Sequence, residues 1–118
     1  MMEMNDNLSR MEETNTLEKR YHPAGTISDL KPGAGRSIEI GNDVIAVFNF
    51  GGEIFALNDL CPHRGAPLCE GFLDAGKVFC PWHCFDFNLR TGECTMVPSM
   101  SVATYPVKIE GDTIYILY

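Results

Sequence analysis

Two short segments that each hold one cysteine and one histidine constrain this chain more than any other feature. Cys61 and His63 form the first pair and Cys80 and His83 the second, with sixteen residues between His63 and Cys80. A proline directly follows each cysteine, which fixes φ, removes a backbone donor and stiffens the loop. If the two loops converge in the fold, they place two sulfurs and two nitrogens around one inorganic centre.

Three interpretations fit these four residues. Two unrelated loops with a buried cysteine and an ordinary histidine each would require two independent coincidences. A structural zinc site also uses two cysteines and two histidines, but zinc modules usually pair like ligands within one loop. In a Rieske-type [2Fe–2S] centre, two histidines replace two cysteines on one iron. On that interpretation Cys61 and Cys80 hold one iron, and His63 and His83 hold the other.

The chain from residue 21 onward shows the pattern of short antiparallel strands. Apolar or alternating runs predict strands at 36–40, 44–50, 54–57, 71–73, 78–80, 85–88, 102–109 and 113–118. Glycine, asparagine and aspartate separate them, and turns that recur so often are typical of an all-β sandwich or barrel. Residues 1–20 lack such runs and are expected to be a flexible polar tail before a single domain at 21–118.

The charge balance limits the partners. Of the net charge of −7, residues 21–118 carry −5, from eleven acidic against six basic side chains. A domain with this excess of acidic side chains cannot neutralise phosphates, so nucleic acid and an anionic membrane are not expected as partners. A partner with a basic protein surface is compatible with this charge. No run approaches the roughly 20 apolar residues of a bilayer span, and no secretory signal is visible. A cytoplasmic location with reduced thiols is expected.

The ligand segments and their surroundings resemble a known family. The run Cys61-Pro-His-Arg-Gly-Ala-Pro-Leu, then Glu70-Gly71, Cys80-Pro-Trp-His, Phe87 and Thr91-Gly92, is similar to the Rieske ferredoxins of bacterial ring-hydroxylating oxygenase systems. It equally resembles the small subunit of NADH-dependent nitrite reductase. The resemblance implies an all-β Rieske fold, with an antiparallel β-sandwich base and a small cluster-binding subdomain inserted at about 59–98. It also implies a [2Fe–2S] cluster whose histidine ligands lie close to solvent.

The resemblance implies a one-electron carrier between a flavoprotein reductase and a terminal oxygenase. The alternative is a small [2Fe–2S] subunit bound to a nitrite reductase large subunit, and a zinc-stabilised interaction module comes third. No catalytic site is expected in the chain itself. A mononuclear iron site would need two further histidines and a carboxylate, and only His22 is left; no Gly-rich dinucleotide fingerprint occurs either.

Four residues near the ligands predict a low reduction potential. High-potential Rieske proteins tie their ligand loops with a disulfide, and Ala66 and Trp82 occupy the matching positions here. Those proteins also have a serine and a tyrosine that donate hydrogen bonds to sulfur, where this chain has Phe85 and Phe87. Hydrogen bonds to sulfur stabilise the reduced state, so we expect a midpoint near the lower end of the Rieske range, about −150 mV.

Several other residues have expected roles. Cys69, Cys84 and Cys94 are left over from the ligand set, and Cys84, which replaces a glycine usual in relatives, is expected to be a small buried thiol. Trp82 is expected to shield the cluster. Residues 96–100, with Met96, Pro98 and Met100, are expected to cover the cluster as a third, proline-containing loop. Arg64 either helps docking or is an ordinary solvated charge.

Overall fold

The computed structural model describes residues 19–62, 65–82 and 85–118, and this part of the chain consists mainly of antiparallel strands. The strands are β2 (Tyr21–Thr26), β3 (Gly35–Ile40), β4 (Asp43–Phe50), β5 (Glu53–Asn58), β6 (Phe72–Asp74), β7 (Lys77–Phe79), β8 (Asp86–Asn88), β9 (Thr104–Tyr105), β10 (Val107–Glu110) and β11 (Thr113–Leu117). Short 3-10 helices lie between them: η2 (Ile27–Asp29), η3 (Leu68–Glu70) and η4 (Pro98–Met100). The all-β prediction is confirmed.

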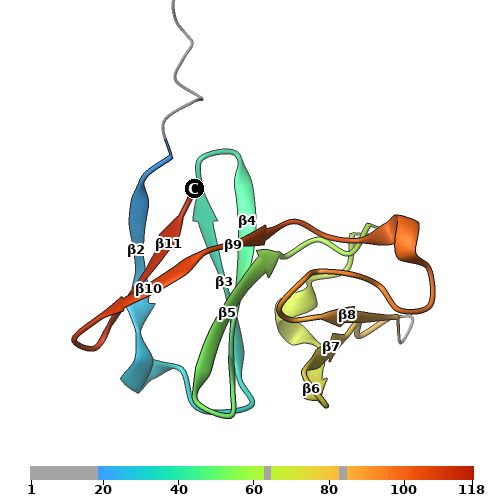
Figure 1. Ribbon diagram of the computed structural model, residues 1–118, viewed down its shortest axis with the longest axis horizontal. Coiled ribbons are helices and arrows are strands. Elements are labelled where there is room, and N and C mark those ends of the chain that lie inside the picture. Colours follow the sequence, from blue (N-terminus) through green and yellow to red (C-terminus); the bar gives the residue numbers. More distant parts are fainter. Residues whose placement is uncertain (1–18, 63–64, 83–84) are drawn as a thin grey trace, which may run out of the picture.

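The strands form three sheets. Their orders are β10–β11–β2, β3–β4–β5–β9 and β6–β7–β8. In Figure 1 the first sheet lies at the left, the second in the middle, and the third, smaller sheet at the right together with η4. The chain leaves the middle sheet after β5, builds the small sheet and returns at β9. The small sheet and the loops around it are therefore an insertion in the chain between two strands of the middle sheet.

Strand β4 is buried on both faces. Ile45 and Val47 belong to an apolar cluster shared with Ile114 and Ile116 of β11, whereas Phe48 belongs to a second cluster that contains Cys61. Successive side chains of a strand point to opposite faces, so β4 separates the two cores. This position explains why its sequence is a nearly continuous apolar run and not a simple alternation. The second cluster, on the side of the small sheet, is called the cysteine-side core below.

The predicted single strand at 102–109 was wrong in its extent. The structure instead has β9, which pairs with β5, and β10, which pairs with β11, so the chain changes sheet at Pro106. Proline cannot donate a ladder hydrogen bond, which favours a break at this position. Its carbonyl accepts a hydrogen bond from the Leu117 backbone N–H at 2.9 Å. After the break Ile109 is 41% exposed, although its spacing of two residues from Val107 is that of two side chains on one buried face.

Gly92 ties the turn after β8 to the segment that leads into β9, and we expect alanine there to be strongly destabilising. Gly92 has φ +77°, its carbonyl accepts the Val102 N–H at 2.8 Å, and an added Cβ would lie 2.1 Å from the Val102 carbonyl oxygen. Left-handed backbone costs about 1–2 kcal/mol and steric overpacking about 1–3 kcal/mol more. Gly92→Ala should therefore lower the free energy of unfolding, measured by urea denaturation, by about 2–5 kcal/mol.

Gly111 provides the matched control. It has φ +61°, but no heavy atom lies within 4 Å of an added Cβ. Gly111→Ala should show only the backbone cost of about 1–2 kcal/mol. Equal losses of unfolding free energy in the two variants would show that the close approach of Val102 is unimportant.

Candidate metal centre

The first ligand loop, residues 59–67, is closed by its own backbone. The Cys61 N–H donates to the Ala66 carbonyl at 2.9 Å, and the Gly65 N–H donates to the Cys61 carbonyl at 2.7 Å. Gly65 has φ +74°, which only glycine adopts readily, so this residue allows the tight return of the chain. Cys61 is only 1% exposed.

The second ligand loop, residues 80–85, is closed in the same way. The Cys80 N–H donates to the Phe85 carbonyl at 2.7 Å, so in each loop the cysteine donates to the carbonyl five residues later. Cys80 is 2% exposed, and both cysteines lie in the cysteine-side core. The structure thus brings two of the four predicted ligands to one core, from two loops that the same backbone hydrogen bond closes. His63, Arg64, His83 and Cys84 lie outside the described residues.

The donor chemistry of the described cysteines fits a [2Fe–2S] cluster held by Cys61 and Cys80. A ligand must be a thiolate, whereas burial, with a further contribution from Asp59, raises the pKa of the Cys69 thiol to about 11. The Cys94 sulfur is fully buried and accepts a hydrogen bond from the Val97 N–H at 3.4 Å. Among the described residues no three metal-binding side chains gather at one point, and two of the four predicted ligands are not among them.

Asp59 anchors the start of the first ligand loop. It is 4% exposed, and its N–H donates to the Val44 carbonyl at 2.8 Å. Its carbonyl accepts the Leu68 N–H at 2.6 Å, and its carboxylate accepts the Cys69 N–H at 2.8 Å. These bonds join β4, the first ligand loop and η3 at one buried residue. Nothing in the sequence pattern singled out Asp59.

A second buried carboxylate lies just after the second ligand loop. Asp86 is 7% exposed and accepts hydrogen bonds from the Thr95 hydroxyl at 2.6 Å and from the Lys77 ammonium at 3.1 Å. The Thr95 hydroxyl, followed by Lys77, lowers the pKa of this carboxyl, which is therefore ionised at neutral pH. Thr95 begins the segment 95–101, called the cover loop below, whose Val97 and Met100 pack against the cysteine-side core.

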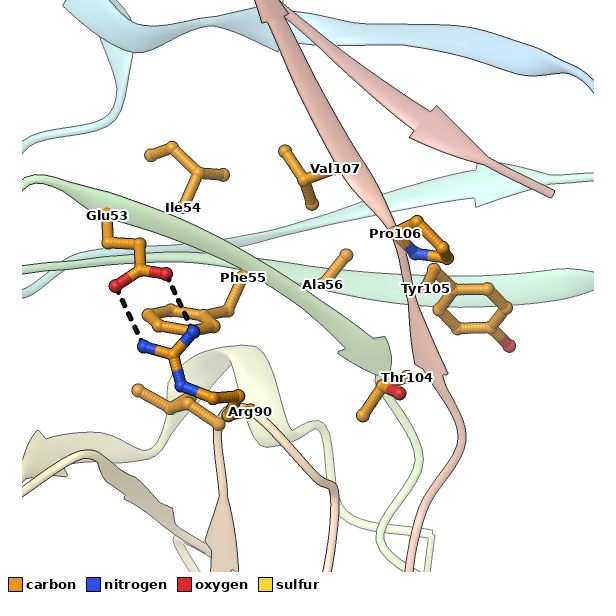
Figure 2. Close-up of a pocket in the computed structure, with 10 residues that line it drawn as sticks. Glu53, Ile54, Phe55, Ala56, Arg90, Thr104, Tyr105, Pro106 and Val107 are labelled. Carbon is orange, nitrogen blue, oxygen red and sulfur yellow. Dashed lines mark hydrogen bonds and ion pairs between the residues drawn. The ribbon is translucent and has the colours of Figure 1, made fainter.

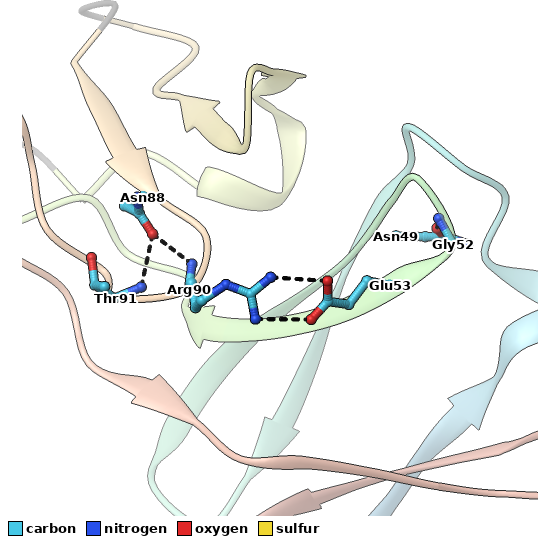
Figure 3. A network of polar contacts seen from close by, with 6 residues as sticks. All are labelled: Asn49, Gly52, Glu53, Asn88, Arg90 and Thr91. Carbon is cyan, nitrogen blue, oxygen red and sulfur yellow. Dashed lines mark hydrogen bonds and ion pairs between the residues drawn. The ribbon is translucent and has the colours of Figure 1, made fainter.

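An ion pair links the middle sheet to the small sheet. The Arg90 guanidinium makes two bonds to Glu53 of β5, at 2.9 and 3.0 Å, and lies 5.1 Å from the ring centre of Phe55 (Figure 2). The Asn88 side-chain oxygen accepts the N–H groups of Arg90 and Thr91, which fixes the turn that carries the guanidinium (Figure 3). Grooves of about 390 and 480 Å³ flank this pair, and both are lined by Glu53, Phe55 and Arg90. Both side chains of the pair are exposed, so the pair contributes little to the stability of the fold.

The family of the chain follows from a comparison with known protein families. Residues 20–106 match the model of the Rieske [2Fe–2S] domain. The chain belongs to this family, and its cofactor is a [2Fe–2S] cluster and not zinc. Its relatives include ferredoxin subunits, so the chain is an electron-carrying component of an oxidoreductase system.

Individual relatives agree with this assignment. The chain is 41% identical over 92 residues to the 3-phenylpropionate/cinnamic acid dioxygenase ferredoxin subunit of Escherichia coli K12, covering 76% of this chain and 86% of that protein. It is 40% identical over 91 residues, or 76% of this chain, to human apoptosis-inducing factor 3, but these span only 15% of that protein.

Solved structures show the same fold. A chain from the complex of reduced oxygenase and oxidised ferredoxin in carbazole 1,9a-dioxygenase aligns with a TM-score of 0.74 and 30% identity, covering 81% of this chain and 91% of that chain. A chain described as a putative NADH-dependent nitrite reductase small subunit from Mycobacterium tuberculosis aligns with a TM-score of 0.80 and 25% identity, covering 86% and 96%. The predicted Rieske fold is confirmed.

Proposed function

We propose that this chain carries single electrons from a flavoprotein reductase to a terminal oxygenase. The observation that carries the proposal is the match to a dioxygenase ferredoxin subunit over nearly its whole length. The likeness to a ferredoxin from an oxygenase–ferredoxin complex supports the same kind of partner. The chain then needs no substrate pocket of its own, and its task is to hold the cluster and to present it to two proteins in turn.

We propose that Cys61 and Cys80 bind one iron and that His63 and His83 bind the other. The matched closure of the two ligand loops and the burial of both cysteines support this set. When bound, the cluster supplies one-electron redox chemistry. The protein fixes the loops by backbone hydrogen bonds and surrounds the sulfur ligands with apolar side chains, which exclude water. The region at about 59–98 is on this proposal the cluster-binding subdomain.

Each of the three loops exposes one large apolar side chain that is suited to docking. Leu60 of the first ligand loop is 50% exposed, Trp82 of the second is 58% exposed, and Met96 of the cover loop is 64% exposed. Exposed apolar side chains often mark protein interaction sites. The exposure of Trp82 does not support the expectation that its indole shields the cluster. Because residues 21–118 are acidic overall, we expect the partners to present a basic surface around the contact.

A second candidate function is the small subunit of a nitrite reductase complex. The structural likeness to such a subunit, which covers nearly all of it, favours this alternative.

Within the described residues no helix is both long and apolar enough to cross a bilayer. A cytoplasmic location remains part of the proposal, because both candidate partners require electron donors of the NAD(P)H type.

Electron transfer with purified proteins tests the proposal. The full chain, loaded with its cluster, is mixed anaerobically with NADH and the flavoprotein reductase of a ring-hydroxylating dioxygenase system, and cluster bleaching is followed by visible absorbance. We expect catalytic reduction by one electron per chain and reoxidation when the oxygenase is added. No reduction, together with stoichiometric co-purification with a nitrite reductase large subunit, would overturn the shuttle in favour of the second candidate.

A further inference from the structure

The two carboxylate oxygens of Asp86 accept hydrogen bonds from different residues. One oxygen accepts the hydrogen bond from the Thr95 hydroxyl, and the other accepts the Lys77 ammonium. Asp86 is the first residue of β8, directly after the second ligand loop, whereas Thr95 is the first residue of the cover loop. A buried carboxylate needs such partners to offset its lost hydration. The arrangement therefore joins the strand that follows one ligand loop to the loop that packs against the cysteine-side core.

Among the residues that the structure describes, the cover loop has few other polar links to the rest of the chain. Of the hydrogen bonds described for residues 95–101, that of the Met100 N–H to the Val97 carbonyl and that of the Ser101 hydroxyl to the Pro98 carbonyl stay within the loop, at 2.8 Å each. The Val97 N–H reaches back to the Cys94 sulfur. The bond from Thr95 to Asp86 is thus the charge-assisted link of this loop to β8, and bonds to an ionised acceptor are about twice as strong as neutral ones.

The loop also buries little surface that would hold it in place without this bond. Met96 is 64% exposed, and the side chains of 98 and 99 are exposed as well. Val97 and Met100 contact the cysteine-side core while remaining partly exposed. A segment with few buried contacts opens locally at low free-energy cost, so one strong bond at its base has a large influence on how often it opens.

We propose that Asp86 is a positioning residue that, through Thr95, holds the cover loop closed over the cluster and limits the access of water and dioxygen. The inference rests on the ligand set proposed above. When the loop opens, dioxygen can take one electron from the reduced centre and leave as superoxide, which wastes the electron. Water that enters stabilises the more negative reduced state, so opening also raises the midpoint potential.

The test compares hydroxyl deletions at the two ends of the cover loop in the cluster-loaded full chain. Thr95→Val keeps the side-chain shape but removes the donor, and the oxidation rate of the dithionite-reduced protein in air-saturated buffer should rise about tenfold, as expected for a lost bond to a charged group. Its midpoint potential should also rise. Thr95→Ser restores the donor and should restore both values. Ser101→Ala removes the hydroxyl that bonds within the loop and should match the wild type.

Iron and sulfide content separate failure of this inference from failure of the ligand set. A Thr95→Val protein with full cluster content that oxidises at the wild-type rate overturns the positioning role, as does an equal rise in Ser101→Ala. Asp86→Asn keeps an acceptor oxygen but loses the charge, and it should oxidise at a rate between those of the wild type and Thr95→Val. If Thr95→Val does not hold its cluster, Asp86→Asn decides the question, and a wild-type rate there overturns the inference.

Discussion

Replacing either buried ligand-loop cysteine by serine is expected to abolish cluster binding. Cys61→Ser and Cys80→Ser should give colourless protein without the Rieske-type EPR signal after dithionite reduction. Serine keeps the size of the side chain but cannot supply the soft thiolate that iron–sulfur clusters require. Both cysteines are at most 2% exposed and lie in one apolar core. Iron and acid-labile sulfide analysis of the purified variants measures the loss.

Cys69→Ser is the matched control for this prediction. Cys69 lies only eight positions after Cys61, but its raised pKa, about 11, keeps it a neutral thiol at physiological pH. Its backbone N–H bond to Asp59 does not depend on the side chain. This variant should keep wild-type iron content and EPR signal. If Cys69→Ser lost the cluster as completely as Cys61→Ser, or if Cys80→Ser kept it, the proposed ligand set would be wrong.

The parts of the fold that follow local rules were predictable from the sequence. The hairpin of β4 and β5 follows from apolar runs flanking Gly51-Gly52, and the turn between β6 and β7 follows from the residues at 74–77. The extent of the strand at 102–109 was not predictable from apolar alternation. Its continuation beyond Pro106 depends on which sheet offers a partner, and that is a long-range property.

At the site, the sequence singles out only the proposed ligands. Chemistry alone singles out Cys61 and Cys80, because few structures need a thiol and an imidazole at such spacing. By contrast, Asp86 and Asn88 both alternate with phenylalanines at 85 and 87, and the alternation does not distinguish between them. The structure buries Asp86 at 7% exposure because Lys77 from β7 and Thr95 from the cover loop both reach it. Partners that lie nine residues away on either side leave no local signal.

The second large effect is expected in the reduction potential when a hydrogen-bond donor is placed beside the cluster. We expect the wild-type midpoint to lie near the lower end of the Rieske range, about −150 mV. Phe85 offers the better site for a donor, because it is only partly buried, and its backbone carbonyl, which accepts the Cys80 N–H, is kept by any substitution. Phe87 is fully buried, so a tyrosine there would overpack the cysteine-side core.

Phe85→Ser should raise the midpoint by about 60 mV, provided that its hydroxyl favours the reduced state by a tenfold change in equilibrium. The sign follows from charge, since reduction adds an electron and a donor stabilises the more negative sulfurs. Phe85→Ala removes the same ring without adding a donor, so only the difference between the two variants reports the hydrogen bond. Redox titration followed by visible absorbance measures both. Equal shifts of the midpoint in the two variants would assign the effect to water entering where the ring had been. A clearly positive midpoint of the wild-type protein would contradict the low-potential prediction itself.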